Sequence, residues 1–443
     1  MPSPPPSRAR FAGALARHAA RRASHFAAPL LSRAIGNLSA GFVVFTIVAA
    51  APLVIGVCAY FVYPLVLWTV ATSRKIPEYD SRVMAWPFVT VTVPVYNAAA
   101  SIRETLEHLL ALDYPREKLQ ILVISDASDD ATDAIVRSLG DRGVELLRMP
   151  ERRGKTVAEN AALRAARGEI LVNVDSTILV PAGSLKSLVR VFENPEIGVA
   201  SGRDISTGES GKHATRAESG YVGYEMWIRG LETKVGSIVG ASGCFYASRR
   251  AVHAEALPAG LSWDFASVLK ARVLGYRSVS VRNATCIVPR STEVRTEMSR
   301  KVRTMARGLS TLFYYRELMN PFAYGEFAMM LVAHKLLRWL PYLLAPIAYA
   351  ALCILALGSV GALIVLALVT AGLLIGVAGM HWRGARIPKP VALAGFVVAV
   401  LCAGFLAWIA AFRQSQLATW MPTPRPQASI DPKSERRRAQ VSL

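Results

Sequence analysis

The chain has 443 residues, of which 53% are hydrophobic, and a formal net charge of +20 at pH 7. Its five cysteines include no CxxC and no Cys/His cluster, so neither a zinc site nor a disulfide framework is indicated, which suits a reducing cytoplasm. The surplus of Lys and Arg is typical either of the cytoplasmic flanks of membrane spans or of a nucleic-acid binder. No helix-turn-helix or RNA-binding signature accompanies the charge, so we expect membrane lipids as partners and no nucleic acid.

The N-terminal part of the chain divides into a basic tail and an apolar segment. Residues 1–37 are rich in Arg, Ala and Pro and contain no acidic residue, which predicts a disordered tail, with a transit peptide or an over-extended start as the alternatives. Residues 38–72 carry no charged side chain and predict an N-terminal transmembrane segment. A helix of this length exceeds a hydrocarbon core of about 30 Å. We therefore expect one tilted span with an interfacial extension, with a helical hairpin as the alternative.

Residues 85–325 have the composition of a soluble domain and begin with alternating strands and helices. β-branched or apolar runs predict strands over Pro87–Pro94, Leu119–Ser125 and Val144–Met149, and amphipathic patterns predict helices over Asn97–Ala111 and Ala131–Leu139. This alternation predicts an α/β fold with a parallel sheet covered by helices. Ligands then bind beyond the carboxyl ends of the strands.

The stretch Arg152–Val180 reads as a basic glycine turn, a helix, and a strand that ends at Asp175. Lys155 follows Gly154 and could approach a diphosphate, although a solvated loop is the alternative and the P-loop pattern GxxxxGK[ST] is absent. Asp175 could hold Mg²⁺ or Mn²⁺ against phosphate oxygens, or it could simply cap the strand.

Three further groups have residue types that suit chemistry on a sugar nucleotide. Asp126 closes the second strand, close to Tyr96 at the end of the first, where it could accept hydrogen bonds from a base or ribose, or merely cap a turn. Asp264, after Trp263, could deprotonate an acceptor hydroxyl. Arg300 and Arg303 lie in a basic helix predicted over Thr292–Thr311 and could stabilise a diphosphate, or attract a membrane surface. The small-residue segment Val239–Cys244 is interpreted as a turn between two short strands.

The C-terminal part of the chain is apolar again. His334, Lys335 and Arg338 interrupt the run, so residues 327–340 predict an interfacial amphipathic helix. Residues 341–412 predict about three transmembrane helices, and residues 413–443 predict a disordered basic tail. Three spans after a cytoplasmic domain would place that basic tail outside, against the positive-inside tendency, so the span count is open by one.

Taken together and in this order, the groups resemble those of the membrane-bound family 2 glycosyltransferases of the inverting GT-A type. This family includes cellulose, chitin and hyaluronan synthases and bacterial exopolysaccharide glycosyltransferases. The resemblance covers about Pro87–Leu312. It implies a Rossmann-like α/β GT-A domain with a mostly parallel sheet, flanked by transmembrane helices. It also implies an integral protein of the bacterial inner membrane whose catalytic domain is cytoplasmic.

The resemblance also implies roles for individual residues. Tyr96 and Asp126 would contact the uridine, Lys155 the diphosphate, Asp175 the Mg²⁺ or Mn²⁺ ion, Asp264 would be the catalytic base, and Arg300 and Arg303 would belong to the (Q/R)xxRW motif. The sequence departs from the family pattern at three positions. Thr177 replaces the second Asp of DxD, Trp263 replaces the acidic residue before the base, and Thr304 replaces the Trp of the last motif.

The expected function is inverting transfer of a sugar from a UDP-sugar to a polysaccharide or lipid-linked acceptor, in exopolysaccharide or cell-envelope glycan synthesis. Its partners would be the nucleotide-sugar donor, the glycan or lipid-linked acceptor, and polysaccharide export proteins. One alternative is single-sugar transfer to a lipid such as a polyprenyl phosphate or ceramide, which Thr304 favours. The other is a catalytically silent, nucleotide-sensing membrane subunit, which Thr177 and Trp263 favour.

Overall fold

The protein was analysed as a computed structural model, which describes residues 40–74, 85–207, 213–289, 294–382 and 387–413. The predicted tails, residues 1–37 and all but the first residue of 413–443, lie outside the described residues. The chain divides into two compact units. The smaller comprises Met1–Val54 and Leu344–Gly372, and the larger comprises Ile55–Leu343 and Leu373–Leu443. Each unit is described by itself.

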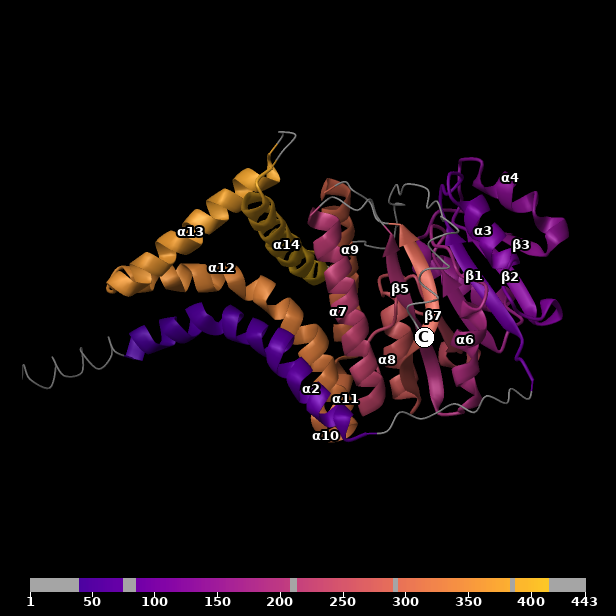
Figure 1. Ribbon diagram of the computed structural model, residues 1–443, viewed down its shortest axis with the longest axis horizontal. Coiled ribbons are helices and arrows are strands. Elements are labelled where there is room, and N and C mark those ends of the chain that lie inside the picture. The colour runs from indigo at the N-terminus through magenta and orange to yellow at the C-terminus, as the bar shows by residue number, and fades with distance from the viewer. Residues whose placement is uncertain (1–39, 75–84, 208–212, 290–293, 383–386, 414–443) are drawn as a thin grey trace, which may run out of the picture. The chain divides into compact units, whose positions relative to one another are not determined.

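The larger unit is built on a seven-stranded sheet in the order β3-β2-β1-β4-β6-β5-β7 (Figure 1). The strands are β1 (Val89–Val95), β2 (Leu119–Ser125), β3 (Val144–Arg148), β4 (Ile170–Val174), β5 (Ile197–Thr207), β6 (Phe245–Arg249) and β7 (Arg277–Pro289). Strand β6 is antiparallel to β4 and β5, and all other neighbours are parallel. The predicted α/β fold with a mostly parallel sheet is therefore confirmed.

Strand register explains why the sequence-predicted residues reach one edge of the sheet. Every residue of β1 is buried, as expected for a central strand covered on both faces. Val95 pairs with Ser125, so Tyr96 and Asp126 leave the sheet from neighbouring positions. Val89 pairs with Ile170, which aligns β4 with β1 and brings its terminal Asp175 to the same edge.

Helices cover both faces of the sheet. The face formed by alternate β1 valines packs with α3, α4 and α6, while Leu122 and Ile124 on the opposite face pack with α5. The helices of this part are α3 (Ile102–Leu110), α4 (Thr132–Arg137), α5 (Lys155–Ala165), α6 (Ser184–Arg190), α7 (His213–Val235), α8 (Trp263–Val273) and α9 (Val294–Tyr314). The segment Val239–Cys244 follows α7 rather than a strand, so its predicted position between two strands is wrong.

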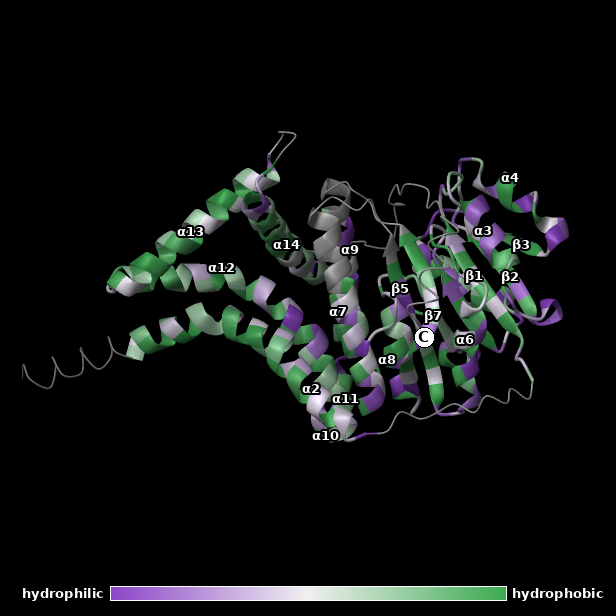
Figure 2. Ribbon diagram, viewed as in Figure 1, coloured by the Kyte–Doolittle hydropathy of each residue, from purple (hydrophilic) through white to green (hydrophobic). Residues whose placement is uncertain are grey.

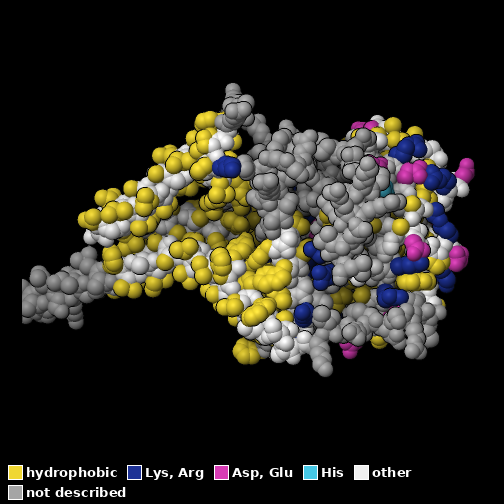
Figure 3. Space-filling view, in the orientation of Figure 1, with side chains coloured by type: hydrophobic (Ala, Val, Ile, Leu, Met, Phe, Trp, Pro, Cys, Tyr) yellow, Lys and Arg dark blue, Asp and Glu magenta, His cyan; other side chains and the backbone are white. Residues whose placement is uncertain are grey.

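Four described helices are long and apolar enough to cross a membrane, which supports a membrane-associated protein (Figure 2). They are Ala40–Thr72, Glu326–Ala356, Val360–Met380 (α13) and Lys389–Phe412 (α14). The first is one continuous helix that ends in a π-helical turn η1 (Cys58–Val62) and α2 (Tyr63–Thr72), so the hairpin alternative is wrong. The second joins α11 (Glu326–Leu331), η7 (Val332–Leu336) and α12 (Leu337–Ala356), and the short α10 (Pro321–Tyr324) precedes it. Hydrophobic side chains cover α12 and α13 (Figure 3).

The polar residues inside the second of these helices face inward. His334 and Arg338 were interpreted as the polar face of an interfacial helix, but their exposed fractions are only 2% and 4%. Both contact acidic side chains of α7: His334 contacts Glu232 and Glu225, and Arg338 donates to Glu225. The interpretation was wrong because the sequence does not show that acidic partners from α7 cover this face.

Candidate active site

The loops after β1 and β2 are tied together by side chains. The Asn97 amide donates to Asp129 Oδ1 at 2.5 Å and accepts from the Asp129 backbone N–H at 3.0 Å. Asn97 adopts a positive φ of 48°, a conformation that Asn tolerates better than most residues. Next to it, the Arg152 guanidinium lies over the Tyr96 ring, 3.8 Å from the centroid. A planar cation stacked on an aromatic ring at a strand end forms a surface on which a nucleobase can stack.

Asp126 holds the basic glycine turn in place. The side chain is buried, and its two oxygens accept hydrogen bonds from the backbone N–H groups of Arg153 and Gly154 at 2.8 and 2.7 Å. Gly154 has φ 91° and ψ 164°, a backbone region that only glycine enters readily. Asp126 therefore positions the turn, and its remaining lone pairs are what a nucleotide could use.

Lys155, Asp175 and Asp264, which we call the strand-end cluster, gather around Gly243. Lys155 Nζ lies 2.7 Å from Asp175 Oδ1 and 3.4 Å from the Gly243 carbonyl oxygen. Burial lowers the pKa of Lys155, but the Asp175 and Glu159 carboxylates outweigh it and hold the pKa above its ordinary value. A lysine fixed in its charged form suits the binding of an anion.

Glu159, which was not predicted from the sequence as a site residue, lies next to Lys155 of this cluster. Its side chain is 1% exposed, and burial raises its pKa to about 8, against the opposing effect of Lys155. The Lys155 ammonium is 3.9 Å from Glu159 Oε1, too far for a hydrogen bond that would offset the lost hydration. Glu159 is therefore mostly protonated at neutral pH. Its position at i+4 from Lys155 on the same helix face was the available signal.

Asp264 lies in the first turn of α8 and is oriented by its neighbours. Ser262 Oγ donates to Asp264 Oδ1 at 2.7 Å, and Oδ2 faces Gly243, where a Cβ would lie 3.4 Å away. The preceding Trp263 points into the core, 3% exposed and stacked on His253 with ring centroids 4.5 Å apart. Burial lowers the pKa of His253 to about 3, so the histidine is neutral. Trp263, which replaces the acidic residue of the family pattern, thus packs in the core, and Asp264 faces the site.

Helix α9 contributes three arginines at i, i+3 and i+7, which share one face. Arg303 lies beside Arg307 and Arg300, and burial together with these like charges lowers its pKa. Arg307, which sequence reasoning missed, donates to Thr156 Oγ1 and to the Leu261 carbonyl, and it lies close enough to Glu159 and Asp264 for their charges to affect its pKa. The structure therefore brings Arg307 to the strand-end cluster, with Arg303 and Arg300 further along the same face. The sequence feature that could have identified Arg307 is its spacing of four residues from Arg303.

The side chains of the site can be compared with the ligands that a divalent metal ion needs. Asp175 offers a carboxylate that already attracts the Lys155 ammonium at 2.7 Å, so this position favours a cation. Among the described residues, no group of three His, Cys, Asp or Glu side chains could hold a metal unaided. Mg²⁺ is often held by one or two carboxylates together with substrate phosphates. The residues therefore fit an ion that is shared with a diphosphate, and Asp175 would be its protein ligand.

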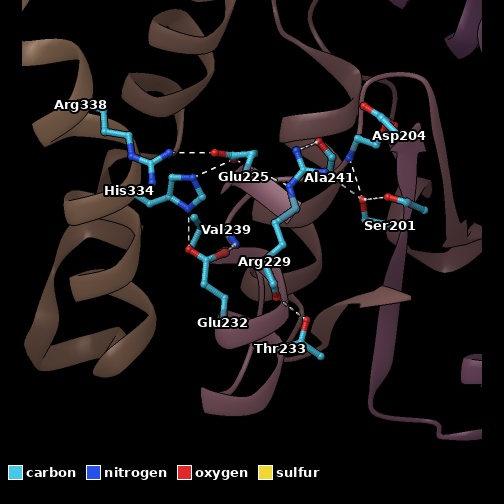
Figure 4. Close-up of polar contacts among 12 residues, drawn as sticks. Ser201, Asp204, Glu225, Arg229, Glu232, Thr233, Val239, Ala241, His334 and Arg338 are labelled. Atoms are coloured by element: carbon cyan, nitrogen blue, oxygen red, sulfur yellow. Dashed lines mark hydrogen bonds and ion pairs between the residues drawn. The ribbon is translucent and has the colours of Figure 1, made fainter. Parts of the chain in front are cut away.

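The segment Ala241–Gly243 that borders the cluster is held from behind by α7 (Figure 4). Arg229 of α7 donates to the Ala241 carbonyl oxygen at 3.2 Å. The backbone N–H of Ser242 donates to Ser201 Oγ at 2.8 Å, and its hydroxyl donates to Asp204 Oδ1 at 2.6 Å. The wall of the site therefore depends on the polar contacts that this segment makes with α7 and β5, and none of these residues was predicted.

Arg229 also belongs to a group of buried polar and charged side chains, which we call the α7 charge cluster. The other members are Tyr63, Glu225, Glu232, His334 and Arg338. His334 contacts Glu232 Oε1 at 2.5 Å and Glu225 Oε1 at 2.8 Å, and Arg338 donates to Glu225 Oε2 at 2.8 Å (Figure 4). The Tyr63 hydroxyl donates to Glu232 at 2.6 Å. Burial raises the pKa of Glu225, but His334 and its cationic neighbours outweigh it and hold the pKa well below its ordinary value. The cluster fixes α2, α7 and η7 to one another.

With this geometry established, the chain was compared with known proteins. The model of the family "Glycosyl transferase family 2" matches residues 90–256, which include Tyr96, Asp126, Lys155 and Asp175. The chain carries a family 2 glycosyltransferase domain. The matched residues begin in β1 and end beyond β6, so they contain most of the sheet on which the candidate site is built.

Curated relatives and a solved structure agree with this assignment. The chain is 27% identical over 164 residues to an N-acetylglucosaminyltransferase of Rhizobium sp. (strain N33), covering 35% of each protein. It is 26% identical over 201 residues to a beta-monoglucosyldiacylglycerol synthase of Synechocystis sp., covering 44% of this chain and 41% of the relative. The match thus spans well under half the length of these relatives. The structure of the mannosyltransferase PcManGT from Pyrobaculum calidifontis, in complex with GDP-Man and Mn²⁺, matches with 25% identity and a TM-score of 0.63, covering 83% of this chain and 99% of that one.

Proposed function

We propose that the protein is an inverting membrane glycosyltransferase that moves a sugar from a nucleoside diphosphate sugar to a glycan or lipid-linked acceptor. The observation that carries this proposal is the strand-end cluster: a fixed lysine, a carboxylate for a metal and an oriented carboxylate gather around Gly243. The family 2 domain and the likeness to a mannosyltransferase bound to GDP-Man and Mn²⁺ support it. UDP is the nucleotide that we expect from the resemblance seen in the sequence.

In the proposed reaction, an acceptor hydroxyl gives its proton to Asp264 while its oxygen attacks C1 of the donor sugar. The bond from C1 to the diphosphate oxygen breaks, and the nucleoside diphosphate leaves with the electron pair. Attack opposite the leaving group inverts the anomeric carbon. The hydrogen bond from Ser262 keeps the Asp264 carboxylate in place for this step.

The donor diphosphate would lie between the glycine turn and α9. Lys155 and the arginines Arg307, Arg303 and Arg300 would stabilise the charge that develops on the leaving diphosphate. A divalent ion held with Asp175 would supply Lewis-acid neutralisation of the same charge. Tyr96, stacked with Arg152, would bind the nucleobase by stacking.

Transfer of one sugar to a lipid is the second candidate function. Thr304, where processive relatives have a tryptophan, is exposed on α9. A beta-monoglucosyldiacylglycerol synthase, whose name describes a glycolipid product, is among the relatives. Product mass separates the two functions, because a polymerase yields a ladder of products and a lipid glycosyltransferase yields a single addition.

The decisive experiment is release of nucleoside diphosphate by the full chain in lipid nanodiscs. UDP-glucose, UDP-galactose, UDP-N-acetylglucosamine, UDP-glucuronate and GDP-mannose would be offered in turn with Mg²⁺ or Mn²⁺ and a membrane lipid extract. We expect metal-dependent release from one donor, and release that is lower by about 10²-fold or more in Asp264→Asn. Donor binding without release in any mixture would instead support a nucleotide-sensing subunit.

A further inference from the structure

Two neighbouring cavities lie where the end of the first membrane helix meets the sheet domain, and all their lining residues belong to the larger unit. The first, about 840 Å³, lies between α2, α7 and the strands β5 and β7. The second, about 860 Å³, lies between the end of α7 and α10–α11. They share Lys234 and Arg277. Cavities of this size hold small ligands.

The first cavity is strongly basic. Its lining includes the cations Arg190, Arg203, Lys234, Arg277 and Arg282 and, within the described part of the chain, no Asp or Glu. Arg277 is held by the Gly236 carbonyl oxygen at 2.8 Å. Among the described residues, Arg203, Lys234 and Arg282 have no ion-pair partner. Cations that line one cavity without counter-charges repel one another. An anion bound among them would reduce this repulsion.

The same cavities have an apolar side that is continuous with a membrane helix. Trp68 of α2 and Trp227 of α7 line the first cavity and remain 50% and 46% exposed. Phe322 of α10 lines the second and is 99% exposed. Along α2, Leu65 is 60% exposed. Large apolar side chains exposed beside a membrane helix indicate contact with lipid, and tryptophan favours the membrane–water interface.

We propose that the two cavities bind an anionic phospholipid, with its phosphate among Arg203, Lys234 and Arg282 and its acyl chains along Trp68 and the apolar face of α2. A free phosphate ester would satisfy the cations and leave the tryptophans in water, whereas a zwitterionic lipid would leave the positive charge unbalanced. Basic pockets beside membrane helices are known to select anionic headgroups. The lining includes no residue of the strand-end cluster, so this is a second site, independent of the proposed reaction.

The test is lipid retention by the full chain, measured by native mass spectrometry after exchange between phosphatidylglycerol and phosphatidylcholine. We expect the wild-type protein to retain phosphatidylglycerol preferentially. The triple variant Arg203→Gln/Lys234→Gln/Arg282→Gln should lose this preference by about fivefold for each cation removed. The matched control is Lys118→Gln/Arg137→Gln/Arg164→Gln, which removes the same charge from exposed positions outside both cavities.

Three results would overturn the proposal. The wild-type protein could show no preference, or both triple variants could lose it equally, which would indicate general attraction of a basic protein to acidic lipid. Soluble glycerol phosphate could also displace the lipid at similar concentration, which would show that a free phosphate ester is the ligand. Trp227→Ala gives an independent measurement, because it should weaken lipid retention and leave the cations in place.

Discussion

The strand-end cluster and the α7 charge cluster both assemble carboxylates and cations, but they do so in opposite ways. In the first, Asp175 follows strand β4 and Lys155 begins helix α5, and the side chains of Lys155 and Asp175 are still 22% and 23% exposed. In the second, the side chains of His334 and Glu232 are 1% and 0% exposed, and the partners come from helices more than one hundred residues apart in the chain. Partly open charges are able to exchange partners with a substrate. Buried charges that pair with one another stabilise one arrangement of helices. We therefore expect substitutions in the first to reduce activity and substitutions in the second to reduce stability.

The largest expected effect is at the proposed base. Asp264→Asn should lower turnover by about 10²–10⁴-fold, because proton removal by a positioned group contributes on this scale. Its thermal unfolding should match that of the wild type, since Asn can still accept the hydrogen bond from Ser262. Release of nucleoside diphosphate and melting temperature would be measured together. Turnover close to that of the wild type would remove Asp264 as the base.

The next effect concerns the buried cluster. Glu225→Gln removes the carboxylate that contacts both His334 and Arg338, and breaking a buried pair in this way costs about 3–5 kcal/mol. Chemical unfolding in detergent would measure the loss. The control is Glu107→Gln, which breaks the exposed pair with Arg142 and should change stability little. Equal losses in the two variants would contradict the distinction between the clusters.

A third change tests the glycine turn. Gly154→Ala forces a side chain into a backbone conformation that costs about 1–3 kcal/mol, and the turn should shift away from Asp126. We expect weaker donor binding, measured by titration calorimetry. Gly143→Ala is the matched control, because Gly143 has a similar φ of 93° but follows η3 (Gly140–Arg142). If the two variants bound donor equally well, the turn would have no role in binding.

A fourth change tests a pH dependence of stability at Glu159. Its pKa rises from 4.5 to about 8 on folding, so the folded protein holds a proton that the unfolded chain releases. This contribution to stability is complete below pH 4.5 and is lost as the pH rises to about 8. Glu159→Gln should therefore melt at a higher temperature than the wild type at pH 9 and at the same temperature at pH 4. Parallel melting curves across this range would show that Glu159 is charged in the folded protein.

Sequence alone determined the part of the protein that local patterns encode. β-branched runs and their alternation with amphipathic helices predicted the parallel sheet and placed Asp126 and Asp175 at one edge, because parallel strands end together. Charge-free runs likewise predicted membrane helices. Asp264 was found from its family motif. The roles of these residues stay predictions that the experiments above test.

Tertiary structure decided the features that depend on which distant side chains meet. The sequence placed His334 and Arg338 at a membrane interface, because their acidic partners lie over one hundred residues earlier in α7. The burial that protonates Glu159 depends in the same way on neighbours from other elements. So does the inward direction of Trp263, because the hydrophobic periodicity of one element does not specify its neighbours. The basic cavity beside Trp68 is lined by elements from different parts of the chain, among them α2, α6, β5, α7 and β7. Local patterns set what each element is, while burial and charge pairing depend on the partners that folding brings together.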